Sequence, residues 1–428
     1  MRQRATNRAG FEGPDASRNP APRSPIHGTR SLEHDPLLRF RAEFPILERS
    51  TYLVSNSLGA MPRGVAARMV EYAADWATRG VRAWQDSWWE LPVTVGSAIA
   101  PLIGAAPGEV AMVPNVTIAQ ASILSSLDYK PPRDGIVMTA LDFPSVRYVY
   151  DGLARRLGAR IVVVDTPDGI TIDEDAICAA IDERTRLVCI SDVFFRSAYV
   201  LDIARIVRHA HAMGALVATD SFHSVGVLPV DVKASQVDWL TGGVLKWLCG
   251  GPGGAFVYAS PSLPDSVRPS FTGWQAHAKP FGFAGEMEMA DGAWRWLNGT
   301  PAIPALYAAV EGPRLVHQAG IEAIRAKSRR QTELLIEKAD ARGWAVNAPR
   351  DAARRGGTVA LDVPHGLAVS RALGAREILV DFRPGAGIRV APHFYTSDAE
   401  LDLAVTAIDE ILTTNAWRAF SDTHSPVT

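Results

Sequence analysis

Short, continuous apolar runs alternate with segments of helical periodicity between residues 130 and 260. The helical segments include residues 173–181 and 203–213. Because strands that are apolar at every position are buried on both faces, this alternation predicts a mainly parallel sheet covered by helices on both sides. The predicted strands are residues 136–138, 161–164, 187–190, 216–219, 239–241 and 255–258.

The pattern changes near residue 303, which indicates a second, smaller α+β domain. Further helices are expected at residues 66–80, 93–103, 323–342 and 399–412, and further strands at residues 358–363 and 377–382. The Pro-rich, polar N-terminus favours a disordered segment. The predicted division is a disordered extension at residues 1–35, a large domain at 36–305, a small C-terminal domain at 306–416 and a tail at 417–428.

The composition narrows the class of protein. The chain has 428 residues and a net charge of −2, which gives no electrostatic reason to expect binding to nucleic acid or to a membrane surface. Its 3 cysteines are too few for a disulfide framework and favour the cytoplasm. No apolar run approaches the ~18 residues of a membrane span. His209 and His211, the one close histidine pair, point to different helix faces, so no metal site is expected.

Two residues carry the strongest chemical signal. Asp220 ends the apolar run at residues 216–219, and Lys246 follows a second run and precedes the glycine cluster GGPGG. Pyridoxal phosphate (PLP) needs a lysine that holds its aldehyde as a Schiff base and a carboxylate that keeps its pyridine nitrogen protonated. A surface lysine and a helix-capping aspartate would explain each residue alone. At this spacing, the pair predicts a PLP site.

Weaker signals surround this pair. The turn at residues 113–117 leads into a helix predicted at 118–127, so Val116 and Thr117 offer groups that suit a phosphate. An ordinary helix cap is the more frequent use of such a turn. Phe143 and His223 can stack on or lie beside a cofactor ring, although taken alone each residue is more often structural.

Two further residues suit the cofactor and the substrate. Ser197, in the turn FFRSAYVLD, can bond the phenolic oxygen of PLP, although serine is common in turns. Arg389, in RPGAGIRVAP, follows a glycine-rich entry to an apolar strand. Its guanidinium can grip the α-carboxylate of an amino acid with two parallel hydrogen bonds. A structural ion pair is the alternative, but the amino-acid substrates of PLP enzymes favour the first interpretation.

These residues resemble the kynureninase family, within the class V aminotransferase group of fold-type I PLP enzymes. The likeness covers residues 44–412. It rests on motifs in the family's order: YLVSNSLG at residues 52–59, WELP at 89–92, GSAIAPLIGAAPGEV at 96–110, FPS at 143–145, DSFHS at 220–224 against the family's DxAHS, residues 226–231, Lys246 with GGPG at 250–253, Gly273 with Trp274, Gly299 with Thr300, and residues 389–395.

The resemblance implies a fold and a set of roles. The fold would have a large domain with a mainly parallel seven-stranded sheet and a small C-terminal α+β domain, in a homodimer with shared active sites. Lys246 would be the Schiff-base lysine and proton shuttle, and Asp220 would pair with the pyridine nitrogen. The other implied roles are phosphate binding by Val116 and Thr117, ring contacts by Phe143 and His223, a bond from Ser197 to the ring oxygen, substrate contacts by Asn56, Ser57 and Arg389, and contacts by Trp274 and Thr300 from the second subunit.

Two positions depart from the family pattern. Val146 stands where kynureninases usually carry Asp, and Leu245 stands where they usually carry Tyr, immediately before the lysine. In the family, that pair acts at the phosphate and in proton delivery to the substrate's β-carbon. The exchange predicts either a changed reaction or another acid, such as His277 or Tyr148.

The expected reaction is hydrolysis of L-kynurenine or 3-hydroxykynurenine to anthranilate or 3-hydroxyanthranilate and L-alanine. The alternative is another class V PLP reaction (C–S or β-lysis, transamination, or oxidative or decarboxylating deamination), because these need Lys246 and Asp220 but not the missing pair. Cysteine desulfuration needs a cysteine in the C-terminal half, and none follows Cys249. A catalytically silent binding protein is a third interpretation, which the presence of Lys246 and Asp220 opposes.

Overall fold

The computed structural model describes residues 35–421, so the expected N-terminal extension lies outside the described residues except for Asp35. The largest sheet has seven strands in the order β2-β8-β7-β6-β5-β3-β4. β8 is antiparallel to β7 and β2, and the remaining neighbours are parallel, which confirms the predicted sheet. Its strands are β2 (Val110–Val113), β3 (Gly135–Thr139), β4 (Arg160–Val164), β5 (Thr185–Ser191), β6 (Leu216–Asp220), β7 (Trp239–Gly243) and β8 (Ala255–Ala259).

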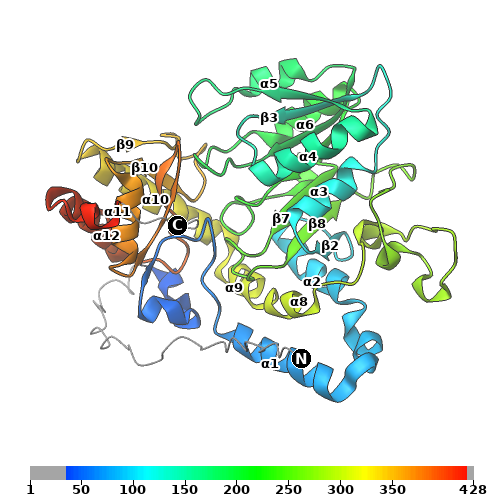
Figure 1. Ribbon diagram of the computed structural model, residues 1–428, viewed down its shortest axis with the longest axis horizontal. Helices are drawn as coiled ribbons and strands as arrows, with labels where there is room; N and C mark the ends of the chain where they lie inside the picture. Colours follow the sequence, from blue (N-terminus) through cyan, green and yellow to red (C-terminus); the bar gives the residue numbers. More distant parts are fainter. Residues whose placement is uncertain (1–34, 422–428) are drawn as a thin grey trace, which may run out of the picture.

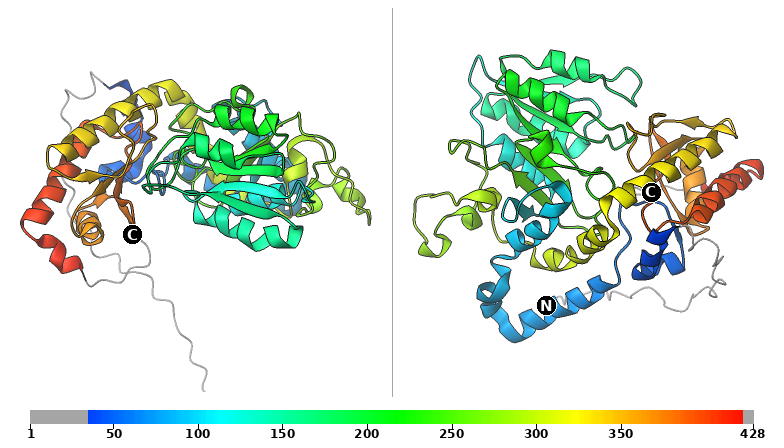
Figure 2. Two further views of the ribbon diagram at one scale, coloured as in Figure 1. Left: turned by 90° about the horizontal axis from the view of Figure 1, so that it is seen from above. Right: turned by 180° about the vertical axis from the view of Figure 1, so that it is seen from behind.

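Helices cover both faces of this sheet (Figures 1 and 2). Side chains alternate along β5, so that Leu187 packs in one core with α3 and α4 and Val188 packs in the other with α6. The apolar runs seen in the sequence follow from this burial on both sides. The large-domain helices are α1 (Gly64–Arg79), α2 (Leu91–Ile99), α3 (Val116–Leu124), α4 (Pro144–Leu157), α5 (Glu174–Ala180), α6 (Ile203–Ala212), α7 (Val232–Ser235), α8 (Ile303–Ala308) and α9 (Glu311–Ala319).

The second domain packs a small antiparallel sheet against helices. The sheet has four strands in the order β12-β13-β10-β9. The strand expected at residues 377–382 is divided, because β11 pairs with β1 and β12 pairs with β13. The elements are β1 (Thr51–Tyr52), β9 (Ala345–Val346), β10 (Val359–Asp362), β11 (Ile378–Leu379), β12 (Asp381–Arg383), β13 (Gly387–Val390), α10 (Ile321–Asp340), α11 (Gly366–Gly374) and α12 (Asp398–Thr413).

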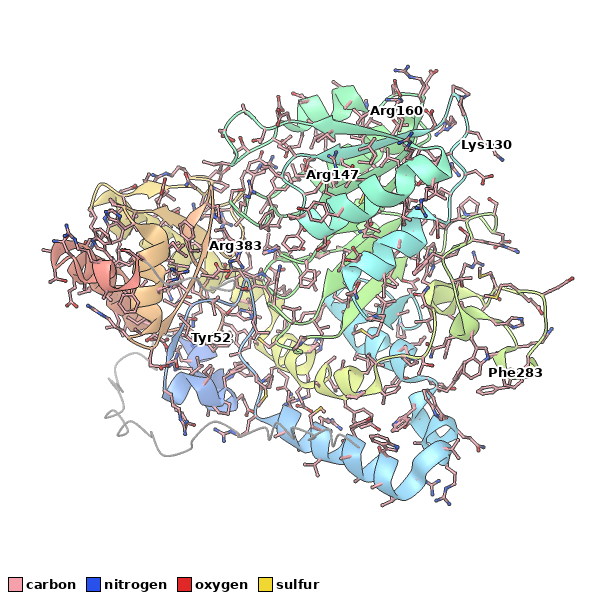
Figure 3. The ribbon with its side chains drawn as sticks, viewed as in Figure 1. Tyr52, Lys130, Arg147, Arg160, Phe283 and Arg383 are labelled. Atoms are coloured by element: carbon pink, nitrogen blue, oxygen red, sulfur yellow. The ribbon has the colours of Figure 1, made fainter. Side chains whose placement is uncertain are left out.

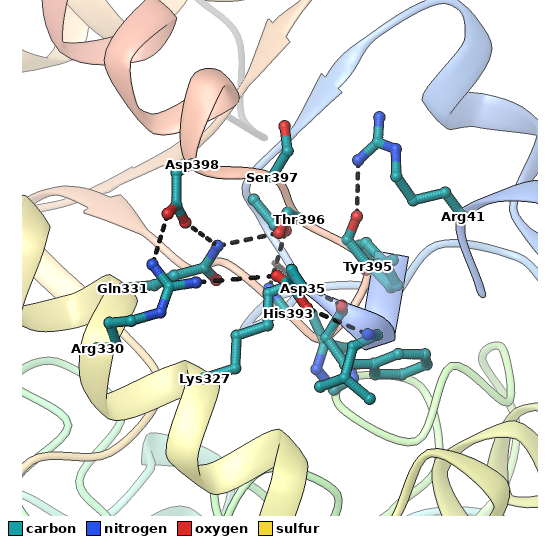
Figure 4. A network of polar contacts seen from close by, with 12 residues as sticks. Asp35, Arg41, Lys327, Arg330, Gln331, His393, Tyr395, Thr396, Ser397 and Asp398 are labelled. Carbon is teal, nitrogen blue, oxygen red and sulfur yellow. Dashed lines mark hydrogen bonds and ion pairs between the residues drawn. The ribbon is translucent and has the colours of Figure 1, made fainter. Parts of the chain in front are cut away.

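The segment at residues 35–54, which the sequence-based division assigns to the large domain from residue 36 onward, contributes to the large-domain core and also packs against the small domain. Lys327 Nζ on α10 lies 2.8 Å from Asp35 Oδ2. Arg41 pairs with Glu400 and donates to the carbonyl of Tyr395 at 2.6 Å, within the polar network of Figure 4. These ion pairs and the β1–β11 pairing attach the segment to the later part of the chain.

The folded part also extends past residue 416, where the tail was expected to begin. Residues Ala416–Phe420 form a short 3-10 helix, and Trp417 and Phe420 pack against the small-domain core. Apolar contact therefore holds these residues in place, and the remainder of the predicted tail lies outside the described residues apart from Ser421. None of the helices within residues 35–421 combines the length and the apolar character that crossing a membrane requires.

Candidate active site

A pocket of about 230 Å³ lies at the carboxyl ends of β5 and β6, the edge where parallel sheets place their ligands. The N-termini of α3 and α4 and the loop after β7 contribute its other walls. The lining residues are Asn115, Val116, Thr117, Phe143, Ser145, Val146, Ser191, Val193, Phe195, Asp220, Phe222, His223, Leu245 and Lys246. Residues far apart in the sequence, including Asp220 and Lys246, thus share one cavity.

Lys246 reaches this pocket beside a histidine and two aromatic rings. Its Nζ makes a 2.7 Å hydrogen bond with His223 Nε2 and lies 4.3 Å from the ring centroid of Phe222. Burial lowers the pKa of Lys246 below its ordinary value, the charge of Asp220 opposes this, and Arg389 lowers it further. Burial also lowers the pKa of His223, with Lys246 adding to the effect. The amine is therefore available in its neutral form.

Asp220 ends β6 and points into the same pocket. One carboxylate oxygen accepts a hydrogen bond from the backbone N–H of Phe222 at 3.1 Å. Burial raises the pKa of Asp220, whereas the nearby Lys246 ammonium lowers it. A protonated pyridine nitrogen beside this carboxylate would supply the positive charge that burial makes necessary, so the site suits the ring of PLP.

The N-terminus of α3 suits the phosphate of PLP. The Asn115 side chain caps this helix by accepting from the N–H of Ile118 at 3.0 Å, as the sequence indicated. Val116 and Thr117 occupy the first two helical positions, whose N–H groups have no partner within a helix, and both line the pocket. The hydroxyl-bearing Ser145 adds a polar residue at the start of α4.

Phe222 is a site residue that the sequence interpretation missed. Its ring and that of Phe143 both lie near Lys246 Nζ, at 4.3 Å and 5.5 Å to the ring centroids. On its other side it lies over Gly243, where a Cβ would come within 2.0 Å of the Phe222 ring. The signal was present in the motif, because DSFHS has Phe where the family pattern DxAHS has Ala.

Arg389 is held by a buried carboxylate rather than exposed to the pocket. Its Nε donates to Asp381 at 2.8 Å, its Nη2 donates to the same carboxylate, and its Nη1 donates to the carbonyl of Phe195 at 2.6 Å. The ion pair that was the alternative interpretation is therefore present. A guanidinium has five N–H groups, so one remains on each Nη for a further acceptor.

Asn56 and Ser57 lie on the N-terminal segment next to Lys246. The N–H of Gly59 in the same turn donates to the carbonyl of Leu245 at 2.7 Å. Asn56 is buried, and both polar atoms of its amide lack a hydrogen-bond partner among the described residues. A buried amide without partners is costly, so this side chain is suited to accept a ligand. Neither Asn56 nor Ser57 is among the residues that line the pocket.

Three other predicted residues are not brought into the pocket. Ser197 Oγ donates to the carbonyl of Ile170 at 2.7 Å, so its hydroxyl is occupied by the protein. Trp274 donates from Nε1 to the carbonyl of Pro280 at 2.6 Å. Thr300 lines a separate cavity with Pro114. The assigned roles of Trp274 and Thr300 require a second subunit and stay predictions.

The two departures from the family pattern face the pocket. Val146 and Leu245 both line it, so two apolar side chains stand where the family pattern has an acid and a phenol. The suggested substitutes are elsewhere: Tyr148 is 71% exposed, and His277 Nε2 bonds the carbonyl of Glu286 at 3.1 Å. Neither lines the pocket in the described part of the chain.

Comparisons of the sequence with known proteins agree on one family. Residues 51–394 match the Aminotransferase class-V family. Kynureninase from Pseudomonas fluorescens is 33% identical over 398 residues, covering 90% of this chain and 94% of that protein. Kynureninase from Burkholderia pseudomallei (strain 1106a) is 32% identical over 400 residues, covering 90% of this chain and 94% of that protein.

Solved structures share the fold at lower identity. The apo structure of cysteine desulfurase from Thermococcus onnurineus NA1 has a TM-score of 0.77 and 20% identity, covering 88% of this chain and 98% of that chain. The complex of the cystine C–S lyase C-DES with its product cysteine persulfide has a TM-score of 0.76 and 22% identity, covering 86% and 99% of the two chains. The chain therefore has the fold expected from the sequence, that of fold-type I PLP enzymes.

Proposed function

The chain belongs to the aminotransferase class-V family and uses PLP, and from this premise we propose that it hydrolyses L-kynurenine or 3-hydroxykynurenine. The products are anthranilate or 3-hydroxyanthranilate and L-alanine. The observation that carries the proposal is the similarity to kynureninases along nearly the whole chain. The shared pocket of Lys246 and Asp220 supports it, because both groups that PLP needs line one cavity.

When bound, PLP supplies an aldehyde for the substrate amine and a ring that accepts electron density from the substrate's α-carbon. Lys246 is the base that removes the α-proton, since its pKa, lowered to about 7, makes the neutral amine accessible near neutral pH. His223, 2.7 Å from Nζ, holds this amine in place. Asp220 keeps the proton on the pyridine nitrogen.

In this proposal, Arg389 and Asn56 orient the substrate. Asp381 fixes the guanidinium of Arg389 from behind, and the two N–H groups that remain on its Nη atoms suit an α-carboxylate. The partnerless amide of Asn56 supplies an additional donor and acceptor. The chain segments that carry the two residues meet, since Val54 and Ala391 pair in an isolated bridge.

A second candidate function follows from Val146 and Leu245. Kynurenine hydrolysis needs an acid that protonates the departing β-carbon, and these two apolar residues supply none. Lysis of a C–S bond at the β-carbon, transamination or an oxidative or decarboxylating deamination needs Lys246 and Asp220 but not this acid. In the first candidate function, the Lys246–His223 pair delivers the proton.

A homodimer is also proposed, with active sites completed across the interface. The segment around Trp274, Phe281 and Phe283 projects from the large domain, and Phe283 is labelled on it in Figure 3. These three side chains are 42%, 59% and 76% exposed. Aromatic side chains gathered in this way favour a protein interface. The expected cytoplasmic location stays a prediction.

The test is product analysis with protein saturated with PLP. The protein is incubated with L-kynurenine, 3-hydroxykynurenine or S-methyl-L-cysteine, and the products are identified by mass spectrometry. Anthranilate or its hydroxy form together with alanine supports the first function. Pyruvate and ammonia from S-methyl-L-cysteine, without anthranilate, would replace it with C–S lysis. Absence of turnover of all three substrates would remove both kynurenine hydrolysis and C–S lysis.

A further inference from the structure

A second pocket, of about 160 Å³, lies behind the catalytic one. Ser191 and Asp220 line the first pocket, whereas their sequence neighbours Asp192, Thr219 and Ser221 line the second. Because successive side chains along a strand point to opposite faces, the two pockets lie on opposite sides of the sheet at the ends of β5 and β6. The two pockets share Val193, but none of the residues assigned to PLP or the substrate lines the second pocket.

This second pocket contains two buried polar atoms without partners. Asp192 is 8% exposed and Ser221 is 1% exposed, and neither Asp192 Oδ1 nor Ser221 Oγ has a hydrogen-bond partner among the described residues. The other carboxylate oxygen, Oδ2, accepts from Ser224 Oγ at 2.5 Å. Ser221 and the backbone N–H groups of Val193 and Asp192 lie near enough to lower the pKa of Asp192, but none of them makes a hydrogen bond of ordinary length and angle to Oδ1. A ligand that donates hydrogen bonds would satisfy both atoms.

The charged residues that line this pocket indicate the charge of its ligand. Its charged members are Asp192 and Asp231, and no lysine, arginine or histidine is among the residues that line this pocket in the described part of the chain. Burial raises the pKa of Asp192 to about 6, while hydrogen bonding from Ser224 lowers it, so the group is mainly ionised at neutral pH. An ionised carboxylate without a cation nearby is a costly arrangement.

Apolar side chains form the remaining walls. They include Val193, Leu201, Ile203, Leu228, Val237 and Leu240. A bare inorganic cation would leave these walls in contact with water, whereas a short hydrocarbon body would cover them. The lining therefore combines an acidic, hydroxyl-bearing floor with hydrophobic sides.

We propose that this pocket is a regulatory site for a small primary ammonium ligand with a short apolar body. The ammonium donates to Asp192 Oδ1 and Ser221 Oγ, and the hydrocarbon part packs against the side chains around Leu228 and Val237. Charge-assisted hydrogen bonds of this kind are stronger than neutral ones.

The pocket is connected to the catalytic one through main chain and charge. The N–H of Asp192 donates to the carbonyl of Asp220 at 3.2 Å, on adjacent strands. After burial, which is the largest cause, the charge of Asp192 adds to the raised pKa of Asp220, and Lys246 opposes both. A cation bound at Asp192 therefore favours the ionised form of Asp220, which is the form that holds the pyridine nitrogen protonated.

The binding test uses holoenzyme reduced with borohydride, in which added amines can no longer react with the cofactor aldehyde. The Tm is measured with n-butylammonium chloride, and with 1-butanol, tetramethylammonium chloride and sodium chloride at equal concentration. A saturable rise with n-butylammonium alone is expected. In Asp192→Asn the apparent Kd for n-butylammonium should rise by about tenfold, because one charge-assisted hydrogen bond is lost. The control Asp128→Asn changes a carboxylate that is 82% exposed and should bind like the wild type.

Equal effects of 1-butanol or sodium chloride, or an unchanged Kd in Asp192→Asn, would overturn the proposal. If that variant does not fold, crystals of the wild-type holoenzyme soaked with 3-bromopropylammonium decide by the anomalous signal of bromine. Bromine beside Leu228 supports the site, and bromine elsewhere only, or absent, refutes it. Unreduced protein tests the coupling between Asp192 and Asp220, because Asp192→Asn should retain PLP to a lower pH than the wild type does. An unchanged pH midpoint for PLP loss would show that the second pocket does not regulate the first. The measurements do not depend on which substrate is cleaved, so failure here leaves the proposed reaction untouched.

Discussion

Phe222 occupies the space over Gly243 that any larger residue would need. A Cβ on Gly243 would lie 2.0 Å from Cζ of Phe222. Gly243 ends β7, Phe222 lies two residues beyond the end of the neighbouring strand β6, and Phe222 lines the catalytic pocket as well. The size of residue 243 therefore limits where the Phe222 ring can lie in the pocket.

Gly243→Ala should push the Phe222 ring into the cofactor pocket. We expect weaker PLP binding, by about tenfold, and a loss of stability of ~1–3 kcal/mol, as overpacked cores show. Fluorescence titration with PLP and the Tm measure the two effects. The double variant Gly243→Ala with Phe222→Ala should recover PLP affinity, because the clash is removed.

Gly152→Ala on α4 is the matched control, since a Cβ there meets no atom within 4 Å. If Gly243→Ala binds PLP as tightly as this control does, Phe222 does not shape the pocket.

Lys246→Ala should remove the covalent attachment of the cofactor. Protein loaded with PLP and treated with borohydride should carry a stable pyridoxyl group in the wild type and none in the variant, as mass spectrometry of the intact chain would show. Lys279→Ala, which changes an exposed lysine paired with Glu288 at 3.1 Å, is the control and should label normally. If the Lys246 variant were labelled to the wild-type level, the cofactor would be attached to a residue other than Lys246.

Asp381→Asn should raise KM for the amino-acid substrate by about tenfold with little change in kcat. The carboxylate holds Nε and Nη2 of Arg389, and a carboxamide oxygen can accept from only part of that pair. Because the pair is buried, the Tm should fall as well. Asp362→Asn, at an exposed position of β10, is the control. A fall in kcat with unchanged KM would argue that Arg389 does not bind the substrate.

Val146→Asp combined with Leu245→Tyr should raise kynurenine turnover by more than the product of the single changes. The two positions line the same pocket, so their side chains can act together on one proton. Steady-state kinetics of the four proteins give the coupling energy. Multiplicative effects on kcat/KM would show that the pair does not act as a unit here.

Asp192→Asn should become increasingly stable relative to the wild type as pH rises from about 4 to about 6. Burial raises the pKa of Asp192 from 3.8 to about 6, so the folded protein binds this proton more tightly than the unfolded chain. Protonated Asp192 therefore stabilises the folded protein below pH 4, and this stabilisation is lost as pH rises through the folded pKa. The free energy of unfolding changes by roughly 3 kcal/mol at most. The Tm of both proteins is compared across this range without added amines. A constant difference in Tm would show that Asp192 does not titrate in this way.

The apolar runs were sufficient to predict most of the large sheet, because a strand buried on both faces has a plain sequence pattern. β2 was missed, since the run Val110–Val113 is short and its antiparallel partner β8 lies far along the chain. The attachment of residues 35–54 to the small domain depends on pairs such as Asp35 with Lys327, which no local pattern reveals.

The site was predictable in part for a similar reason. Asp220 ends β6 and Lys246 follows β7, and the carboxyl ends of these parallel neighbours meet, so strand positions place the two residues together. Ser197 was assigned from its place in a turn and from the family resemblance, but its hydroxyl donates to the carbonyl of Ile170, a contact with a distant loop. Phe222 was overlooked because its importance depends on Gly243 across the neighbouring strand.

His393, from the small domain, donates from Nε2 to the carbonyl of Trp247 at 2.7 Å, next to the catalytic lysine. Arg389 lies four residues earlier in the same chain segment. A movement of the small domain would therefore displace Arg389 together with the peptide that follows Lys246. In the proposed function, binding of the substrate carboxylate and positioning of the Lys246 amine would be coupled through this contact.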